Sequence, residues 1–252
     1  MNKYKGLPDD VSRIVSLACS NHLKNIPPSM VIPLNKGNGR TSLLAHIADR
    51  FKEGGAIDFS SPYLYLEYDL TGTIADIHKT HISIQSNCRY ANQYQGVVAL
   101  GLDGLLPQLT DAAGEDFFAM VKSVKAYATV LLFVPADCCF SSLHYLLHKT
   151  GGSIQLVKPI EPSVSDIVSI FFDSLPDSIK ATYCRPKDLK KCTETVSAYI
   201  ASATPYCTIT SAIELAKNLL YKDEEALVAI FGGQTIQKKE ANHDRRTVEY
   251  IK

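Results

Sequence analysis

The sequence predicts an α/β protein: a doubly wound, parallel, five-stranded sheet followed by a helical region. Two runs, at 96–102 and 129–134, are apolar almost throughout, as in strands that helices cover on both faces. Amphipathic segments alternate with such runs over the first 160 residues, and this alternation is typical of parallel strands joined by helices. After residue 160 helical periodicity continues without a strand pattern.

The order of elements begins with a helix and a glycine-containing turn. Apolar residues recur at helical spacing from 9 to 24, and this helix is expected to end before Pro27. A short apolar run at 30–34 leads through the segment 35–39 into a helix predicted at 40–52. One apolar stripe supports that helix, formed by Leu43, Leu44, Ile47 and Phe51.

The remaining elements divide the chain into regions. In the first half they alternate as a strand at 63–70, a mainly helical segment at 74–94, a strand at 96–102, a helix at 111–127, a strand at 129–134, a short helix around 143–147 and a strand at 154–157. Helices follow at 164–172, 189–203, 209–221 and 224–231. We therefore predict an α/β core at 1–160, a helical domain at 161–233 and a polar, partly basic tail at 234–252.

Composition excludes several classes of protein. Lys plus Arg and Asp plus Glu both number 26, so no net field attracts the whole molecule to nucleic acid or anionic lipid. Seven cysteines without a C-x-x-C pair favour neither a disulfide framework nor a zinc site, and mostly buried thiols are expected. The sequence has no signal peptide or membrane-spanning run, so a cytoplasmic protein without a membrane partner is expected.

One motif carries the functional interpretation. The segment Leu34-Asn-Lys-Gly-Asn-Gly-Arg-Thr41 resembles the phosphate-binding loop of P-loop NTPases, especially its AAA+ form. Glycines in such a loop let backbone amides surround phosphates at a helix N-terminus. The resemblance implies that ATP or ADP with Mg²⁺ would contact Gly37, Asn38, Gly39, Arg40, Thr41 and Ser42, with Thr41 as the metal ligand. Arg40 stands where the family has lysine, and its planar guanidinium cannot occupy the lysine pocket unchanged.

The other AAA+ positions are altered in this sequence. The run from Gly96 resembles the Walker B strand, but Gly101 and Leu102 stand where the family has carboxylates; a shifted alignment makes Asp103 the aspartate and leaves no glutamate. For the sensor-one polar residue the candidates are Asp137 and Thr129. In the arginine-finger region the sequence has His148 and Lys149. The segment 160–170 resembles the opening of the AAA+ helical lid, without a clear sensor-two arginine at 208–216.

Two smaller clusters leave alternatives open. Cys138 and Cys139 are expected to pack in the interior, unless a helix N-terminus lowers a thiol pKa and makes it reactive. Tyr90 and Tyr94, beside Arg89, form a polar aromatic group that either packs at a helix end or contacts a base or a neighbouring subunit.

Three functions are compatible with the sequence. The first is a pseudo-ATPase: an AAA+-like assembly or partner-docking subunit, in a homo- or hetero-oligomer, that binds nucleotide weakly or not at all and is not an efficient ATPase. The second is an ATP-binding AAA+ protein with slow hydrolysis in an oligomer. The third is a DNA-associated factor of the clamp-loader or mobile-element kind, which the basic residues of the tail would support.

Overall fold

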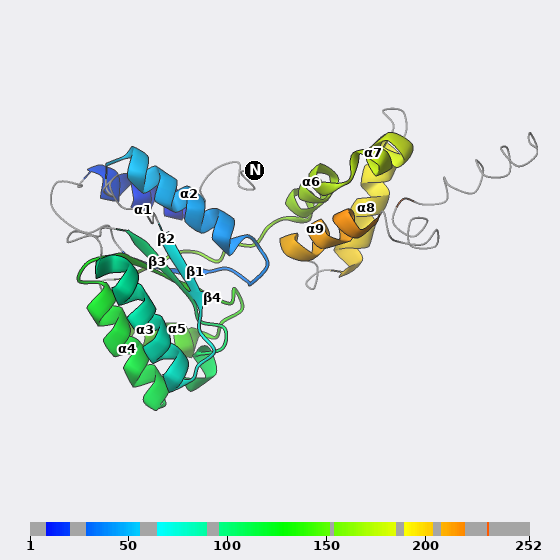
Figure 1. The fold of residues 1–252 in the computed structure, drawn as a ribbon. Coiled ribbons are helices and arrows are strands. Elements are labelled where there is room, and N and C mark those ends of the chain that lie inside the picture. Colours follow the sequence, from blue (N-terminus) through cyan, green and yellow to red (C-terminus); the bar gives the residue numbers. More distant parts are fainter. Residues whose placement is uncertain are drawn as a thin grey trace, which may run out of the picture. The chain divides into compact units, whose positions relative to one another are not determined.

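The structure, a computed structural model, describes residues 9–20, 29–55, 65–89, 96–151, 154–184, 189–203, 208–219 and 231. The chain forms two compact units, 1–161 and 162–252. The first unit contains the sheet and the second is helical in its described part (Figure 1). The polar aromatic group at 90–94, the predicted helix at 224–231 up to residue 230, and the tail lie outside the described residues.

The predicted doubly wound parallel sheet is confirmed. Its five strands lie in the order β2-β3-β4-β1-β5, and every neighbouring pair is parallel. The strands are β1 (Ser29–Pro33), β2 (Tyr65–Asp69), β3 (Val97–Gly101), β4 (Thr129–Val134) and β5 (Ile154–Leu156). The three central strands are buried along their whole length, which explains why their sequences are almost uniformly apolar.

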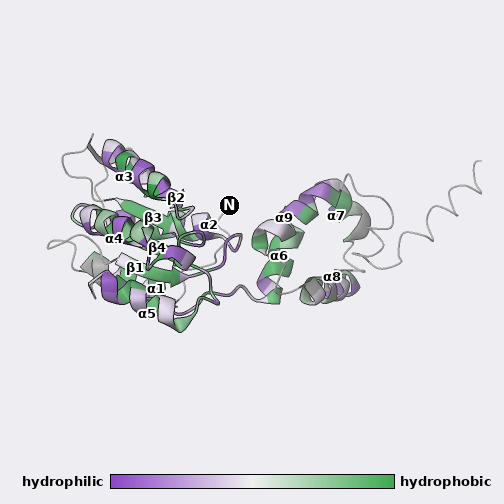
Figure 2. Cartoon of the chain, turned by 90° about the horizontal axis from the view of Figure 1, so that it is seen from below, coloured by the Kyte–Doolittle hydropathy of each residue, from purple (hydrophilic) through white to green (hydrophobic). Residues whose placement is uncertain are grey.

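Alternate residues of each central strand enter two different cores. Val98 and Leu100 of β3 face one core, whereas Val97 and Ala99 face the other. The first core is covered by α3 (Ile74–Arg89), α4 (Ala112–Val124) and α5 (Phe140–Lys149), and the second by α1 (Asp9–Ser20) and α2 (Arg40–Glu53), as Figure 1 shows. A short 3-10 turn, η1 (Leu106–Gln108), precedes α4. The central strands β1, β3 and β4 are strongly hydrophobic, and the helices carry both hydrophobic and hydrophilic residues (Figure 2).

The helical unit has a core of its own. Its helices are α6 (Val164–Ser174), α7 (Asp177–Tyr183), α8 (Leu189–Ala203) and α9 (Ile209–Asn218). Capping boxes at Ser163 and Thr208 fix the starts of α6 and α9. Phe171 belongs to this core and is fully buried. The sequence analysis did not predict α7, because seven residues are too few to show a helical period.

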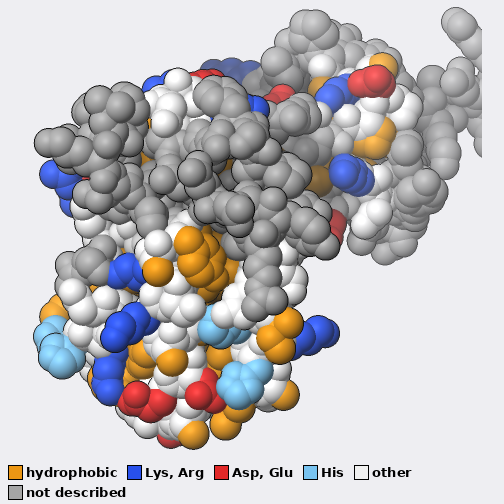
Figure 3. Space-filling model, turned by 60° about the vertical axis from the view of Figure 1, so that its left-hand side comes forward, with side chains coloured by type: hydrophobic (Ala, Val, Ile, Leu, Met, Phe, Trp, Pro, Cys, Tyr) orange, Lys and Arg blue, Asp and Glu red, His pale blue; other side chains and the backbone are white. Residues whose placement is uncertain are grey.

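The described surface seen in Figure 3 has no dominant charge. Acidic and basic side chains are both present on the face seen in Figure 3, with apolar side chains among them. None of the helices in the described part of the chain combines the length and the hydrophobicity that crossing a bilayer requires.

Gly114 tests the packing of α4 against the turn before it. A Cβ atom at this position would lie 1.9 Å from the carbonyl oxygen of Leu109, and backbone cannot yield as a side chain can. Glycine-to-alanine changes inside helices normally stabilise by about 0.5–1 kcal/mol. We expect Gly114→Ala instead to lower the free energy of unfolding by about 1–3 kcal/mol, measured by urea denaturation. A stabilised variant would show that this contact is relaxed in solution.

Candidate functional site

The glycine-containing loop lies at the carboxyl edge of the sheet, between β1 and α2. The backbone N–H of Leu34 donates to Val134 O (2.8 Å), which extends the β1–β4 pairing, and Ala136 N donates to Asn35 Oδ1 (2.8 Å). Gly37 and Gly39 have φ values of 86° and 90°. This left-handed conformation strains any residue with a Cβ, so both glycines are required for the loop to turn into α2.

Arg40, the first residue of α2, points into the protein instead of into solvent. Its side chain is 5% exposed. Nε donates to Leu34 O (2.7 Å), and NH2 and NH1 form a two-point ion pair with Asp103, with 3.0 Å between NH2 and Oδ1. The guanidinium carbon lies 5.6 Å from the ring centre of Phe133. The residue at the lysine position of the motif therefore joins the loop to the segment after β3.

Two carboxylates at the end of β2 pair with Lys36 of the loop and with Thr41 in the first turn of α2. Lys36 Nζ lies 2.6 Å from Asp69 Oδ2, and the Thr41 hydroxyl donates to Glu67 Oε1 (3.1 Å). The hydrogen bond from Lys36 to Asp69, together with the carboxylate charge, raises the pKa of Lys36 above its ordinary value. Both contacts are solvent-exposed, so they direct side chains more than they stabilise the fold.

Gly101 provides the space for Asp69. The two residues are aligned partners on β3 and β2. A Cβ at position 101 would lie 2.2 Å from Asp69 Oδ1 and 3.3 Å from Arg40 NH1. A side chain at position 101 is therefore incompatible with the present position of Asp69.

The six residues predicted to bind nucleotide all lie in this loop or in the first turn of α2. Asn38 is nearly buried, Thr41 is exposed and Ser42 is half-buried. Asp103 also reaches the site, as the shifted alignment suggested, and there it contacts Arg40. Sequence reasoning missed Glu67 and Asp69; the available signal was a pair of acidic residues at the end of a predicted strand.

The two sensor-one candidates differ in position. Thr129 is the first residue of β4 and is fully buried, and its backbone N–H donates to Gly96 O (3.0 Å) at the amino edge of the sheet. The prediction for Thr129 is therefore wrong, because the loop lies at the opposite edge. Asp137 follows β4 at the carboxyl edge and is exposed.

Lys149, in the region where the family has its arginine finger, contacts its own chain. Its Nζ lies 2.8 Å from Glu115 Oε1 and 5.6 Å from the ring centre of Tyr145. The Glu115 carboxylate raises the pKa of Lys149. Both residues line a hollow of about 540 Å³ between α4 and the end of α5, which no residue of the loop lines.

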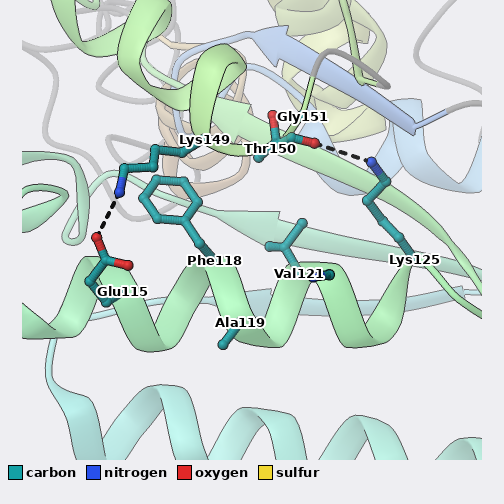
Figure 4. Close-up of a pocket in the computed structure, with 9 residues that line it drawn as sticks. Glu115, Phe118, Ala119, Val121, Lys125, Lys149, Thr150 and Gly151 are labelled. Atoms are coloured by element: carbon teal, nitrogen blue, oxygen red, sulfur yellow. Dashed lines mark hydrogen bonds and ion pairs between the residues drawn. The ribbon is translucent and has the colours of Figure 1, made fainter.

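The floor of this hollow is apolar and its rim is basic. Phe118 and Val121 project from α4 toward the turn after α5 (Figure 4). At the opposite end from Lys149, Lys125 Nζ lies 3.5 Å from Thr150 O. Partial burial lowers the pKa of Lys125.

The cysteines are less buried than the sequence analysis expected. Of those whose surroundings are described, Cys192 is buried, Cys19, Cys138 and Cys184 are half-buried, and Cys139 is exposed. No group of three or more potential metal-ligating His, Cys, Asp or Glu side chains is found in the described ranges.

Arg40 gives the first prediction for this site. Arg40→Ala leaves the Asp103 carboxylate and the Leu34 carbonyl without their guanidinium partner, so the free energy of unfolding should fall by about 2–3 kcal/mol in urea denaturation. Arg50→Ala is the matched control on the same helix, because Arg50 forms only an exposed ion pair with Glu53 (3.2 Å). This substitution should lower the free energy of unfolding by less than about 0.5 kcal/mol. Equal losses would contradict the assigned role of Arg40.

Cys139 gives the second prediction. Hydrogen bonds from Ser141 and then Ser142 to its sulfur lower the thiol pKa from 9.0 to about 7. Because the thiolate is the reactive form, its alkylation by iodoacetamide should rise with pH around a midpoint near 7. The double change Ser141→Ala and Ser142→Ala should move the midpoint upward, as followed by mass spectrometry of the peptide. An unchanged midpoint would mean that the hydroxyls do not set the pKa.

Comparison with known proteins identifies the fold. No protein-family model matches the sequence, and no curated protein matches it either. The solved structures that resemble it include Caenorhabditis elegans PCH-2 (TM-score 0.55, 12% identity, 86% of this chain and 63% of that chain) and Aeropyrum pernix ORC2 in ADPNP–ADP complexes (0.55, 13%, 97% and 72%). A structure of katanin self-assembly is also similar (0.53, 13%, 95% and 78%). The chain thus spans less than two thirds of PCH-2. These neighbours are AAA+ ATPases, and the α/β unit of this chain has the AAA+ fold.

Proposed function

We propose that this chain is an AAA+-like assembly or partner-docking subunit that binds nucleotide weakly or not at all and does not hydrolyse ATP efficiently. The observation that carries the proposal is the conformation of Arg40. Its guanidinium is buried against Leu34 O and Asp103, so it does not extend toward the space in front of the loop. In the AAA+ fold the residue at this position reaches the terminal phosphates.

Electrostatics supports the same conclusion. The side chains joined at the loop are two cations, Lys36 and Arg40, and three carboxylates, Glu67, Asp69 and Asp103. The cluster is therefore net negative, whereas a phosphate site needs net positive charge or a metal ion to offset the charge of the nucleotide. Phosphates entering here would have to displace Asp69 from Lys36 and Glu67 from Thr41.

Under this proposal the fold serves protein contacts instead of ATP hydrolysis. The katanin structure named above concerns self-assembly, and its similarity to this chain covers 95% of this chain. We therefore propose an oligomer, of this chain or with a partner protein, as the functional state. The proposed core at 1–160 and helical domain at 161–233 would form its two structural parts.

A slow ATP-binding protein is the second candidate, and the backbone of the loop favours it. Gly37 and Gly39 have the left-handed conformation that lets a loop enclose an anion, and α2 directs its positive end toward the loop. The ORC2 neighbour holds ADPNP and ADP. In this alternative Thr41 would leave Glu67 and bind Mg²⁺, and a neighbouring subunit would complete the site.

Calorimetric titration with Mg-ATP and Mg-ADP, with hydrolysis assayed on the same samples, separates the two candidates. For the wild type we expect no saturable binding up to about 1 mM nucleotide and no turnover. A dissociation constant of about 1 mM corresponds to a binding free energy of about 4 kcal/mol. Micromolar binding with turnover would overturn the proposal in favour of the second candidate.

Removing the two carboxylates of β2 tests the electrostatic explanation for weak nucleotide binding. The variant Glu67→Gln/Asp69→Asn should show saturable Mg-ATP binding below about 1 mM, where the wild type shows none, because it removes two negative charges beside the loop. Asp49→Asn/Glu53→Gln makes the same change of charge on exposed residues late in α2 and should leave Mg-ATP binding undetectable, as in the wild type. Equal effects of the two pairs would mean that net charge, and not the position of Glu67 and Asp69, controls nucleotide binding.

A further inference from the structure

The helical unit contains two thiols in close contact. Cys184 is the C-terminal cap of α7, and Cys192 lies in the first turn of α8. Their Sγ atoms are 3.8 Å apart. This contact joins a sulfur at the end of α7 to a sulfur in α8. The sulfur of Cys139, by comparison, contacts the hydroxyl groups of Ser141 and Ser142.

The two cysteines differ in their access to solvent. Cys192 is 2% exposed and belongs to the core of the helical unit, while Cys184 is half-buried at the edge of that core. A reagent in solution therefore reaches Cys184 first. Once Cys184 has reacted, Cys192 is the sulfur in position to attack it.

Lys180 favours the thiolate form of Cys184. Lys180 lies one turn before Cys184 in α7, and its Nζ donates a hydrogen bond to Asp173 O (3.1 Å). The pKa of Cys184 is lowered, first by the hydrogen bond with Cys192 and also by the Lys180 charge, which together outweigh partial burial. The more accessible thiol of the pair is thus also one whose pKa is lowered, which increases its thiolate fraction at neutral pH.

We propose that Cys184 and Cys192 form a reversible disulfide, making the helical unit redox-responsive. A disulfide bond of about 2.05 Å requires the two sulfurs, now 3.8 Å apart, to approach by about 1.8 Å. The oxidant is a low-molecular-weight disulfide such as oxidised glutathione. The product joins the end of α7 to the beginning of α8.

The reaction balances in two exchange steps. The Cys184 thiolate attacks one sulfur of oxidised glutathione, whose S–S bond breaks, and the first glutathione leaves as a thiolate that takes up a proton. Cys192 then loses its proton and its sulfur attacks Cys184 Sγ, releasing the second glutathione, which is protonated in turn. Two protein thiols are oxidised and one molecule of oxidised glutathione is reduced to two thiols.

Peptide mapping of the full chain tests the proposal. Trypsin places Cys184 in the peptide 181–187 and Cys192 in the peptide 192–217, which also contains Cys207. The experiment therefore uses a Cys207→Ser background. After treatment with oxidised glutathione at neutral pH, we expect these two peptides to be linked, with two hydrogens lost, and to separate on treatment with dithiothreitol.

Two single variants in the same background test the order of steps. Cys192→Ser should stop at a glutathione adduct on Cys184, whereas Cys184→Ser should leave Cys192 unmodified because it is buried. Glutathione addition to the exposed Cys139 is an internal control that the reagent is active. Absence of the 181–187/192–217 link in samples where Cys139 is modified would overturn the proposal.

Thermal unfolding supplies a second readout. Oxidation should raise the melting temperature of the Cys207→Ser protein by a few degrees and leave that of the Cys192→Ser variant unchanged, because only the former gains a cross-link. Circular dichroism of each reduced variant establishes that it is folded before the comparison. Equal shifts in both proteins would contradict a Cys184–Cys192 disulfide.

Discussion

The carboxyl edge of the sheet depends on one buried guanidinium. Arg40 contacts the carbonyl oxygen at the start of the loop, the carboxylate after β3 and the face of a ring on β4. Three segments far apart in the sequence are thereby held at one point. A buried charge of this kind is tolerated only when its hydrogen-bonding groups are paired, so the surrounding residues are fixed in turn. The buried charge at this edge thus belongs to a side chain of the protein that faces inward and away from the space in front of the loop.

The sheet could be predicted from the sequence because its strands are unusually uniform. β3 and β4 are buried on both faces, so nearly every residue in them is apolar and the signal is strong even in five or six residues. The helix α7 was missed because a single pair of turns shows no periodicity. The loop was found because glycines in a strand–helix junction have a recognisable pattern, and its two left-handed glycines follow that pattern.

The contacts of the site could not be read from the sequence. Glu67 and Asp69 lie about 30 residues from their partners Thr41 and Lys36, and they meet them only because β2 occupies the edge of the sheet in a particular register. The mistake over Thr129 has a simpler cause, since a residue that begins a parallel strand lies at the edge away from the loop. Sequence patterns thus identify which elements form, while strand register determines which side chains meet.

The absence of a side chain at position 101 restricts how this sequence can change. A Cβ at this position would meet Oδ1 of Asp69, which is the end of a side chain that is about half exposed. A larger residue at position 101 would therefore turn the Asp69 carboxylate outward and away from Lys36. Substitutions at positions 69 and 101 are thus expected to be non-additive, because both act on the same contact.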